Sequence, residues 1–520
     1  MITIIASIIR NKIIKEIQDT KFFSLLADEV TDCSNLEQLS VVLRFVDANK
    51  QIREEFLDFI TIERITGESL SAALLSWLEE HEIDVDFCRG QGYDGASSTS
   101  SSSVGVQARI CQISPLALYT HCQSHQLNLC VVKSCSIPVI RDASGTVSEI
   151  AKFFNYSPKR QHFFGHIIES VSPNEEKKKL KDLCKTCWIQ RIDSYIAFYE
   201  LYPAILKTME SISECSAEYG NWSWDMETLT KANGFLHQFS SFQFLVSVSV
   251  TMRILSSIRS LTVNLQKKAN DILVAYEHVS DVLTELELLK INCNEEFHSW
   301  FDEIKDFANK LNIPVTTPRI SSRQVHRANV PANSPEVYYR RNVMIPFLDH
   351  LSSEMHSRFG PVQQIKIKLL GLIPSTAVTY SSASIKDGEL YKADLPSPHL
   401  LTTEFSRWKM KFAPLPSQKR PSTLQEALEC CDEDAFPNIK VLLVIACTLL
   451  VTTCETERAN NQLKLLKTYI RSTMSEERLS SLALIKVHRR MITDIEIDQL
   501  VSDFARKQLR RMRLPCVLTD

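Results

Sequence analysis

The sequence predicts a mixed α/β domain that a long helical segment interrupts and that the last part of the chain completes. Three strand patterns follow one another over residues 22–62, with turn residues at 47–50. Leucine, isoleucine and phenylalanine then recur at spacings of three or four over residues 135–435. We therefore predict a first part of the core at 1–134, a helical insertion at 135–435, and a second part of the core at 436–520.

The order of elements in the first part predicts the type of sheet. The segments FFSLLAD, LSVVLRFVD and IREEFLDFITI read as strands, and short connections favour antiparallel pairing among them. A helix at 68–81, a strand near 85–88, a glycine-rich turn, a helix and a strand at 116–119 follow. Such a mixed sheet with helices packed against it is the α/β layer that ribonuclease H-like domains use.

Composition and the amino-terminal segment limit the class of protein. The 520 residues are 44% apolar and 23% charged, as in an ordinary globular protein, and the net charge of −3 gives no overall basic field. The first residues read as an amphipathic helix because Arg10, Lys12 and Lys15 break the apolar run, which argues against a signal peptide. No apolar window approaches the roughly 20 residues of a membrane span, so no membrane partner is expected. Fifteen scattered cysteines are typical of reduced thiols in the cytosol or nucleus.

Two acidic residues follow predicted strands and suggest a shared metal site. Asp28 ends the apolar run FFSLLA, and Asp94 lies in the loop GQGYDG. That loop also matches a dinucleotide fingerprint, but no acidic residue lies between Asp94 and Asp142 to hold a ribose, so a tight turn with close backbone approach is preferred. Two carboxylates at neighbouring strand ends suit Mg²⁺ or Mn²⁺, and a third acid from a helix would complete such a site.

The segment TTCETERANNQ offers that third acid. Glu455 lies three residues after Thr452, so helix capping explains it, whereas Glu457 has no such explanation except a solvated helix face. The following residues predict two amphipathic helices, with apolar positions Leu463, Leu466, Leu479 and Leu482.

Other polar clusters were weighed as zinc or DNA sites. Cys122 and His125 could join Cys184 and Cys187 around zinc, but the gap between the pairs is far longer than in compact zinc modules, so zinc is not expected. Trp188 reads as a packing residue in a lysine-rich helix. An arginine-rich loop contains Arg319, Arg323 and Arg327. Such a charge run is usually just solvated, although it also suits contact with a phosphate backbone.

Several ordered motifs together resemble a known family. These are LLADEVTD, EQLSVVLRFVD, RGQGYDGAS, HCQSHQLNL, ETER and LKTYIRSTMSEERLSSLAL. They resemble hAT-superfamily DNA transposases and proteins domesticated from them, in the zinc finger MYM-type and repressor-of-the-inhibitor-of-protein-kinase subgroup. The resemblance extends over nearly the whole chain and is strongest at 20–132 and 436–490.

The resemblance implies a ribonuclease H-like core with a D-D-E triad, here Asp28, Asp94 and Glu457, using two Mg²⁺ or Mn²⁺ ions on DNA phosphodiesters. It further implies DNA contact at Trp188 and a Cys-x-x-His element at Cys122 and His125. The last helices would form a dimerisation segment, and the expected compartment is the nucleus.

Departures from the family pattern leave two functions open. Cys187 replaces the arginine before the tryptophan, SSTSSSS replaces a glycine-containing stretch after Asp94, and Ala459, Asn460 and Asn461 replace the usual serine and phenylalanine. No zinc finger precedes the core, so end recognition is expected to be missing. The sequence therefore predicts a domesticated or decayed transposase, either still able to cleave phosphodiesters or acting as a non-enzymatic dimerising regulatory protein.

Overall fold

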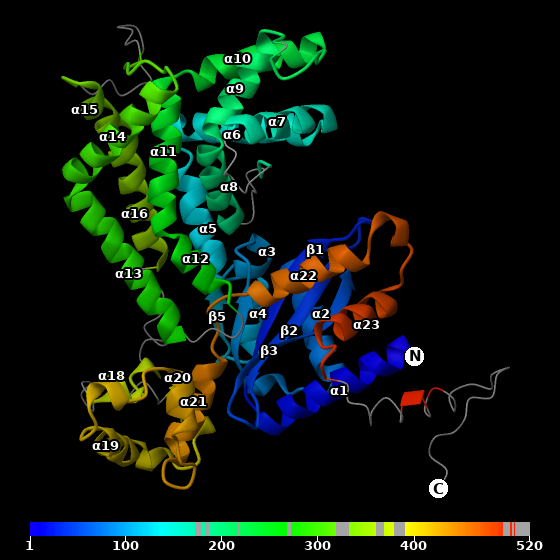
Figure 1. Ribbon diagram of the computed structural model, residues 1–520. Coiled ribbons are helices and arrows are strands. Elements are labelled where there is room, and N and C mark those ends of the chain that lie inside the picture. The colour runs from blue at the N-terminus through cyan, green and yellow to red at the C-terminus, as the bar shows by residue number, and fades with distance from the viewer. Residues whose placement is uncertain are drawn as a thin grey trace, which may run out of the picture. The chain divides into compact units, whose positions relative to one another are not determined.

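The computed structural model divides by its internal contacts into two units (Figure 1). The sheet unit comprises residues 1–126, 265–277 and 363–520, and the helical unit comprises 127–264 and 278–362. The structure describes residues 1–171, 179–181, 188–216, 218–267, 272–318, 332–359, 369–378, 390–491, 500, 501 and 504.

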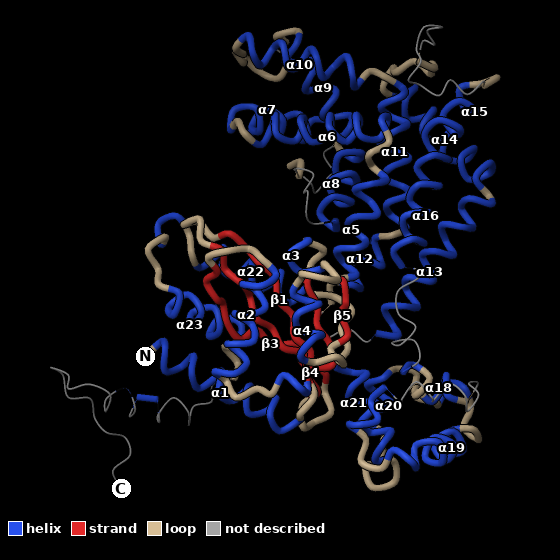
Figure 2. Tube along the Cα trace, turned by 180° about the vertical axis from the view of Figure 1, so that it is seen from behind, coloured by secondary structure: helices blue, strands red, loops and turns tan. Residues whose placement is uncertain are grey.

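One mixed sheet forms the centre of the sheet unit. Its order is β3-β2-β1-β4-β5, with β1, β2 and β3 antiparallel and with β4 and β5 parallel to β1 (Figure 2). The predicted mixed sheet with three antiparallel first strands is therefore confirmed. The strands are β1 (Phe23–Thr31), β2 (Glu37–Val46), β3 (Ile52–Ile62), β4 (Cys88–Tyr93) and β5 (Leu118–His121).

Helices from both ends of the chain cover the two faces and one edge of this sheet. Ser24 of β1 donates to the carbonyl of Thr448 at 2.6 Å, and Arg44 of β2 donates to that of Cys447 at 2.9 Å, so the carboxyl-terminal helices cover one face. The helices of this part are α1 (Ile2–Thr20), α2 (Gly67–Glu80), α3 (Ser97–Ser100), α4 (Val106–Ile113), α21 (Pro437–Thr448), α22 (Cys454–Leu466) and α23 (Glu476–Val487). Residues of α22 and α23 share one hydrophobic core with the strands.

The outer edge of β3 is covered by side chains of α23 and the residue that follows it. The Ser480 hydroxyl accepts from the Phe59 amide and donates to its carbonyl, both at 3.1 Å. The Glu476 carboxylate accepts from the Thr61 amide at 3.0 Å, and His488 lies 2.8 Å from the carbonyl of Phe56. Side chains therefore take the place of a sixth strand.

The glycine-rich segment is part of a strand, which corrects the prediction of a tight turn. Gly90 and Gly92 lie in β4. A Cβ atom on Gly90 would lie 2.3 Å from the Ser24 hydroxyl oxygen, and one on Gly92 would lie 2.7 Å from Leu450 Cδ1. The predicted close approach at these glycines is therefore confirmed, because neighbouring side chains leave no room for a side chain.

Residues 363–435 lie with the sheet unit, whereas the sequence placed them in the helical insertion. Arg89 in β4 donates to Asp394 at 2.8 Å in a buried ion pair, and Lys50 donates to the carbonyl of Cys431 at 3.1 Å. This part contains α18 (Pro374–Ala377), α19 (Leu401–Phe412) and α20 (Leu424–Glu429). Such contacts join residues hundreds of positions apart, so local periodicity could not assign them.

Every regular element described in the helical unit is a helix. The helices are α5 (Gln123–Ser134) and α13 (Ile272–Ile291), which both begin in the sheet unit, α12 (Arg259–Leu265), whose last residue belongs to the sheet unit, and α6 (Pro138–Asn155), α7 (Pro158–Val171), α8 (Trp188–Glu200), α9 (Tyr202–Ser213), α10 (Met226–Phe239), α11 (Phe242–Ser257), α14 (Cys293–Lys310), α15 (Pro335–Tyr339) and α16 (Ile345–Phe359). No single described helix is long and apolar enough to cross a membrane. Helices α10 and α11 together reach that length and apolar character, but their axes are bent by 75° at the break between them.

Candidate carboxylate site

The sheet register brings Asp28 and Asp94 to the same end of two neighbouring strands. In the parallel pair of β1 and β4, Leu25 lies opposite Gln91 and Leu26 lies opposite Gly92. Continued by two residues, this register places Asp28 beside Asp94, and adjacent strands lie about 4.8 Å apart. The parallel pairing therefore brings together two acids that are far apart in the sequence.

Helix α22 brings the third acid over Asp28. The side-chain amide of Asn460 donates to Asp28 Oδ2 at 2.8 Å, which fixes this part of α22 against the end of β1. Glu457 lies one turn earlier, and residues three apart share a face of a helix. The structure therefore gathers the three acids that the sequence singled out.

The three carboxyl groups act on one another electrostatically. Burial raises the pKa of Asp28 well above its usual value, and the charges of Asp94 and Glu457 raise it further. Loss of hydrating water raises the pKa of Glu457 to about 7, with a contribution from Cys122 and an opposing one from Arg458. Concentrated negative charge therefore disfavours full ionisation of this cluster.

Asp94 is oriented by the serine-rich segment that follows it. Its Oδ1 atom accepts from the Ala96 amide and from the Thr99 hydroxyl, each at 3.0 Å. The segment SSTS forms the short helix α3, so the replacement of the family's glycine-containing stretch still leaves a structured support. Both of these hydrogen bonds go to one oxygen of the carboxylate.

The donor chemistry of this cluster suits a hard divalent cation, but the side chains do not converge as ligands. All three acids offer oxygen donors, and a cation would relieve the repulsion that raises the pKa of Asp28. Within the described residues, however, no group of three histidine, cysteine, aspartate or glutamate side chains is placed to hold one metal ion. Side-chain rotation and loss of protons would have to accompany cation binding.

Asn460 and its neighbours show why the departures around Glu457 do not disrupt α22. Ala459 is buried in the core of the sheet unit, and Asn460 is 6% exposed. The amide of Asn460 contacts Asp28, while its Oδ1 atom is buried without a hydrogen-bond partner. Sequence reasoning missed this contact, although the spacing of Asn460 from Glu457 already placed the two on one helix face.

Cys122 has a positioning role beside α22, and DNA contact at Cys122 and His125 stays a prediction. Its side chain is fully buried, and its sulfur accepts from the Thr453 amide at 3.3 Å, directly before α22. Hydrogen bonds from the Cys454 thiol and from Thr453 lower the pKa of Cys122 to about 6. His125 is half-buried and stacks on His121 with ring centroids 5.6 Å apart.

The other acids near Asp28 have separate partners. Glu29 accepts from Ser98 of α3 at 3.4 Å, so it faces the side of the sheet opposite Asp28, as alternation along a strand predicts. Asp32 forms a buried ion pair with Lys467 at 2.6 Å. Glu455 pairs with Arg458 rather than capping α22, whose first flanking residue is Thr453.

The predicted dimerisation leucines contribute largely to the core of their own chain. Leu463 and Leu479 are fully buried, and Leu466 and Leu482 are partly buried. Beside them, Tyr469 and Ile470 are 86% and 94% exposed. Packing inside one chain therefore explains the leucine periodicity, and the exposed apolar side chains are Leu465 near the end of α22 and Tyr469 and Ile470 in the connection to α23.

The remaining predicted contacts cannot be placed in this site. Trp188 begins α8, but its side chain is not described. The arginines at 319, 323 and 327 and the cysteines at 184 and 187 lie outside the described residues.

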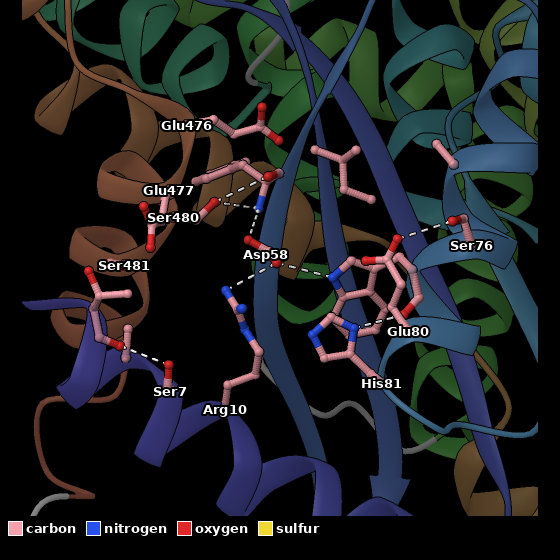
Figure 3. A pocket seen from close by; sticks show the side chains of 16 residues that line it. Ser7, Arg10, Asp58, Ser76, Glu80, His81, Glu476, Glu477, Ser480 and Ser481 are labelled. Atoms are coloured by element: carbon pink, nitrogen blue, oxygen red, sulfur yellow. Dashed lines mark hydrogen bonds and ion pairs between the residues drawn. The ribbon is translucent and has the colours of Figure 1, made fainter. Parts of the chain in front are cut away.

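A separate cavity of about 750 Å³ lies in the sheet unit beside β3 (Figure 3). Asp58 accepts from Trp77 at 3.1 Å and pairs with Arg10 at 3.0 Å, and His81 stacks on Trp77. These polar groups satisfy one another, and β3 lies two strands away from β1. The cavity therefore adds nothing to the carboxylate site.

Comparisons with known proteins agree with this architecture. Residues 1–105 match the family described as ZMYM1/FAM200, RNase-like domain, and residues 417–491 match the hAT family C-terminal dimerisation region. The chain is 30% identical over 522 residues to the 52 kDa repressor of the inhibitor of the protein kinase of Homo sapiens, covering 99% of this chain and 68% of that protein. It is 29% identical over 527 residues to the Mus musculus protein of the same name, covering 100% and 69%.

Proposed function

Because this chain belongs to the hAT-transposase-derived family that includes the 52 kDa repressor of the inhibitor of the protein kinase, we propose that it is a dimerising nuclear protein with a divalent-cation site. The site consists of Asp28, Asp94 and Glu457 in a ribonuclease H-like core, which the helical unit interrupts. Its substrate is the phosphodiester backbone of DNA.

One observation carries this proposal: the parallel register of β1 and β4 brings Asp28 and Asp94 to neighbouring strand ends, and α22, which carries Glu457, lies against Asp28 through Asn460. Bound Mg²⁺ or Mn²⁺ would supply an activated water and stabilise charge on the phosphate. Asp28 and Asp94 would hold the cation from the sheet, and Glu457 would hold it from α22. Asn460 would keep Asp28 oriented through its amide hydrogen bond.

Cation binding is expected to strengthen as the pH rises through about 7. Below that value Glu457 keeps its proton, and the pKa of Asp28 is also raised. Protons therefore compete with the cation for both carboxylates. One required deprotonation makes binding about tenfold weaker for each pH unit below the pKa. Calorimetric titration with Mn²⁺ at pH 6 and pH 8 should therefore give about tenfold weaker binding at pH 6.

The same titration of the Glu457→Gln variant provides the control for this pH dependence. Glutamine carries no titrating carboxyl group, so the remaining affinity should vary less between pH 6 and pH 8. Wild-type affinity that is equal at both pH values, or an absence of Mn²⁺ binding at pH 8, would contradict the proposed cation site.

We further propose that the connection between α22 and α23 contributes the dimer contact. Tyr469 and Ile470 are exposed apolar side chains inside the matched dimerisation region. Replacing Ile470 with aspartate should raise the dissociation constant of the dimer by about tenfold or more, because the interface would then bury an unpaired charge. Sedimentation equilibrium measures this shift.

Met410→Asp is the matched control, since Met410 is 71% exposed in the same unit but lies before the matched region. Unchanged self-association of Ile470→Asp, or equal loss in Met410→Asp, would refute this contact.

A second function is favoured by the hydrogen bond that Asn460 makes to Asp28. An amide donor satisfies a carboxylate without any cation, and the relatives are named as repressors. In this alternative the chain keeps the transposase fold as a non-enzymatic regulatory dimer. A folded dimer that neither binds Mn²⁺ nor cleaves DNA would establish it.

A further inference from the structure

We propose that a pocket in the helical unit binds a nucleotide, either free or unpaired at the end of a nucleic-acid strand. The pocket lies between α6, α10 and the first turns of α7 and has a volume of about 500 Å³, within the range of small-molecule sites. This inference does not depend on the carboxylate site, because all the lining residues belong to the helical unit.

Aromatic side chains form the apolar wall of this pocket. Phe153 and Phe235 pack edge to face with ring centroids 5.6 Å apart. Tyr156, one turn of α6 beyond Lys152, is 75% exposed at the rim. Phe153 is buried, whereas the exposed Tyr156 ring is free to stack on a planar ring beside the partly exposed Phe235, and such stacking is tolerant of which base is bound.

Cationic side chains stand beside the aromatic wall. Lys152, Arg160 and Lys231 line the pocket, and Glu149 is the lining acid. Lys231 also pairs with Glu227 at 2.6 Å, but both side chains are exposed, so this ion pair holds the lysine weakly. The lining therefore favours an anionic group next to the stacked ring.

Arg160 supplies the observation that points to a hydrogen-bond acceptor. Its guanidinium lies over the Phe153 ring, 4.3 Å from the centroid, and Nη1 donates to the Thr228 hydroxyl at 3.3 Å. Its Nε atom is buried without a hydrogen-bond partner. The positive charge of Arg160 contributes to lowering the pKa of the exposed Asp225, but no ion pair joins these two described residues. A buried, unpaired donor is costly, and rotation of the Arg160 side chain toward the pocket would let a phosphate or base oxygen satisfy it.

A planar ring and an anionic group on one ligand describe a nucleotide. A purely apolar ligand would not use the cationic side chains of the lining or the unpaired Arg160 Nε, and a simple phosphate would not use the aromatic wall. The pocket itself does not distinguish a free nucleotide from an unpaired strand end, since both present the same base and phosphate.

Gly234 allows the pocket to be filled without disturbing the fold. It lines the pocket from α10, and a Cβ atom there would meet nothing within 4 Å. Gly145 in α6 is equally open but does not line the pocket. Replacing either helical glycine with leucine improves helix propensity, so Gly145→Leu is a matched control.

The test measures binding of three probes to the full chain by fluorescence anisotropy: labelled adenosine 5′-monophosphate, a blunt DNA hairpin, and the same hairpin with one unpaired 3′ nucleotide. We expect the mononucleotide or the overhang to bind, and Gly234→Leu to weaken that binding by about tenfold or more. The Gly145→Leu variant should bind the probes as the wild type does. The Lys152→Ala variant should bind the mononucleotide more weakly.

The three probes distinguish a free nucleotide from an unpaired strand end as the ligand. Mononucleotide binding with no preference for the overhang identifies a free nucleotide, and preference for the overhang over the blunt hairpin identifies a strand end. The proposal is overturned if neither the mononucleotide nor the overhang binds, or if Gly234→Leu binds both as the wild type does. It is also overturned if phosphotyrosine, a different aromatic anion, competes better than the mononucleotide.

Discussion

Replacing Asp94 with asparagine is expected to reduce Mn²⁺-dependent cleavage of a DNA strand by about 100-fold or more. Mutation of a residue that only supports a metal ligand already lowers metal affinity or activity by about 10–100-fold, and Asp94 is a proposed ligand itself. The substitution removes one of the three carboxyl groups of the site. Asparagine keeps an oxygen that can accept from the Ala96 amide and the Thr99 hydroxyl, so α3 should stay in place. Cleavage of an end-labelled duplex, with Mn²⁺ affinity measured in parallel, gives the effect.

Glu29→Gln is the matched control for Asp94→Asn. Glu29 is an acid of the same strand end, but it contacts Ser98 on the other face of the sheet. This control should retain cleavage within a few-fold. Equal cleavage by the Asp94→Asn variant and the wild type would exclude the proposed triad, whereas a wild type that dimerises without cleaving or binding Mn²⁺ would favour the regulatory function.

Replacing Lys467 with methionine is expected to lower the free energy of unfolding by about 3 kcal/mol, because it leaves the buried Asp32 carboxylate without its cation. The ion pair spans 2.6 Å, and the Lys467 and Asp32 side chains are 3% and 0% exposed. Burial opposes ionisation of Asp32, but its hydrogen bond to Lys467 and the charge of that lysine lower its pKa. Urea unfolding at neutral pH measures the loss.

The pH dependence of this loss has a defined sign. A lowered folded-state pKa stabilises the protein fully above the unfolded pKa of about 4, and this stabilisation declines as the pH falls through the folded value. The difference between the wild type and Lys467→Met should therefore shrink in acid.

Lys464→Met provides the matched control, because Lys464 lies one turn earlier in α22 and is exposed. A double-mutant cycle with Asp32→Asn isolates the pair. Loss of less than about 0.5 kcal/mol in Lys467→Met would show that the pair contributes little.

The sequence predicted the strands and the three acids better than the contacts that support them. The apolar run before Asp28 predicted the end of β1, and the short connections with their turn residues gave the antiparallel order of β1 to β3. The contacts from Asn460 to Asp28 and from Lys467 to Asp32 join residues 432 and 435 positions apart. Local patterns contain no information on such pairs, so these two supporting residues were missed.

The leucines of α22 and α23 illustrate a second limit. An apolar stripe shows that something covers a helix face, but periodicity does not identify what covers it. Here the sheet of the same chain covers Leu463 and Leu479. The exposed residues Tyr469 and Ile470, which could meet a second chain, lie in the connection between the two helices, and the leucine pattern does not single them out.

The cover over β3 also determines whether the matched dimerisation region can be treated as a separable module. Without Glu476, Ser480 and His488, the backbone of Phe56, Phe59 and Thr61 would lose its partners and become a template for strand addition from another molecule. A shortened chain lacking α23 would therefore tend toward open-ended polymers rather than monomers. Helix α23 thus protects against aggregation, and it also lies next to the exposed residues Tyr469 and Ile470 proposed for ordered dimerisation.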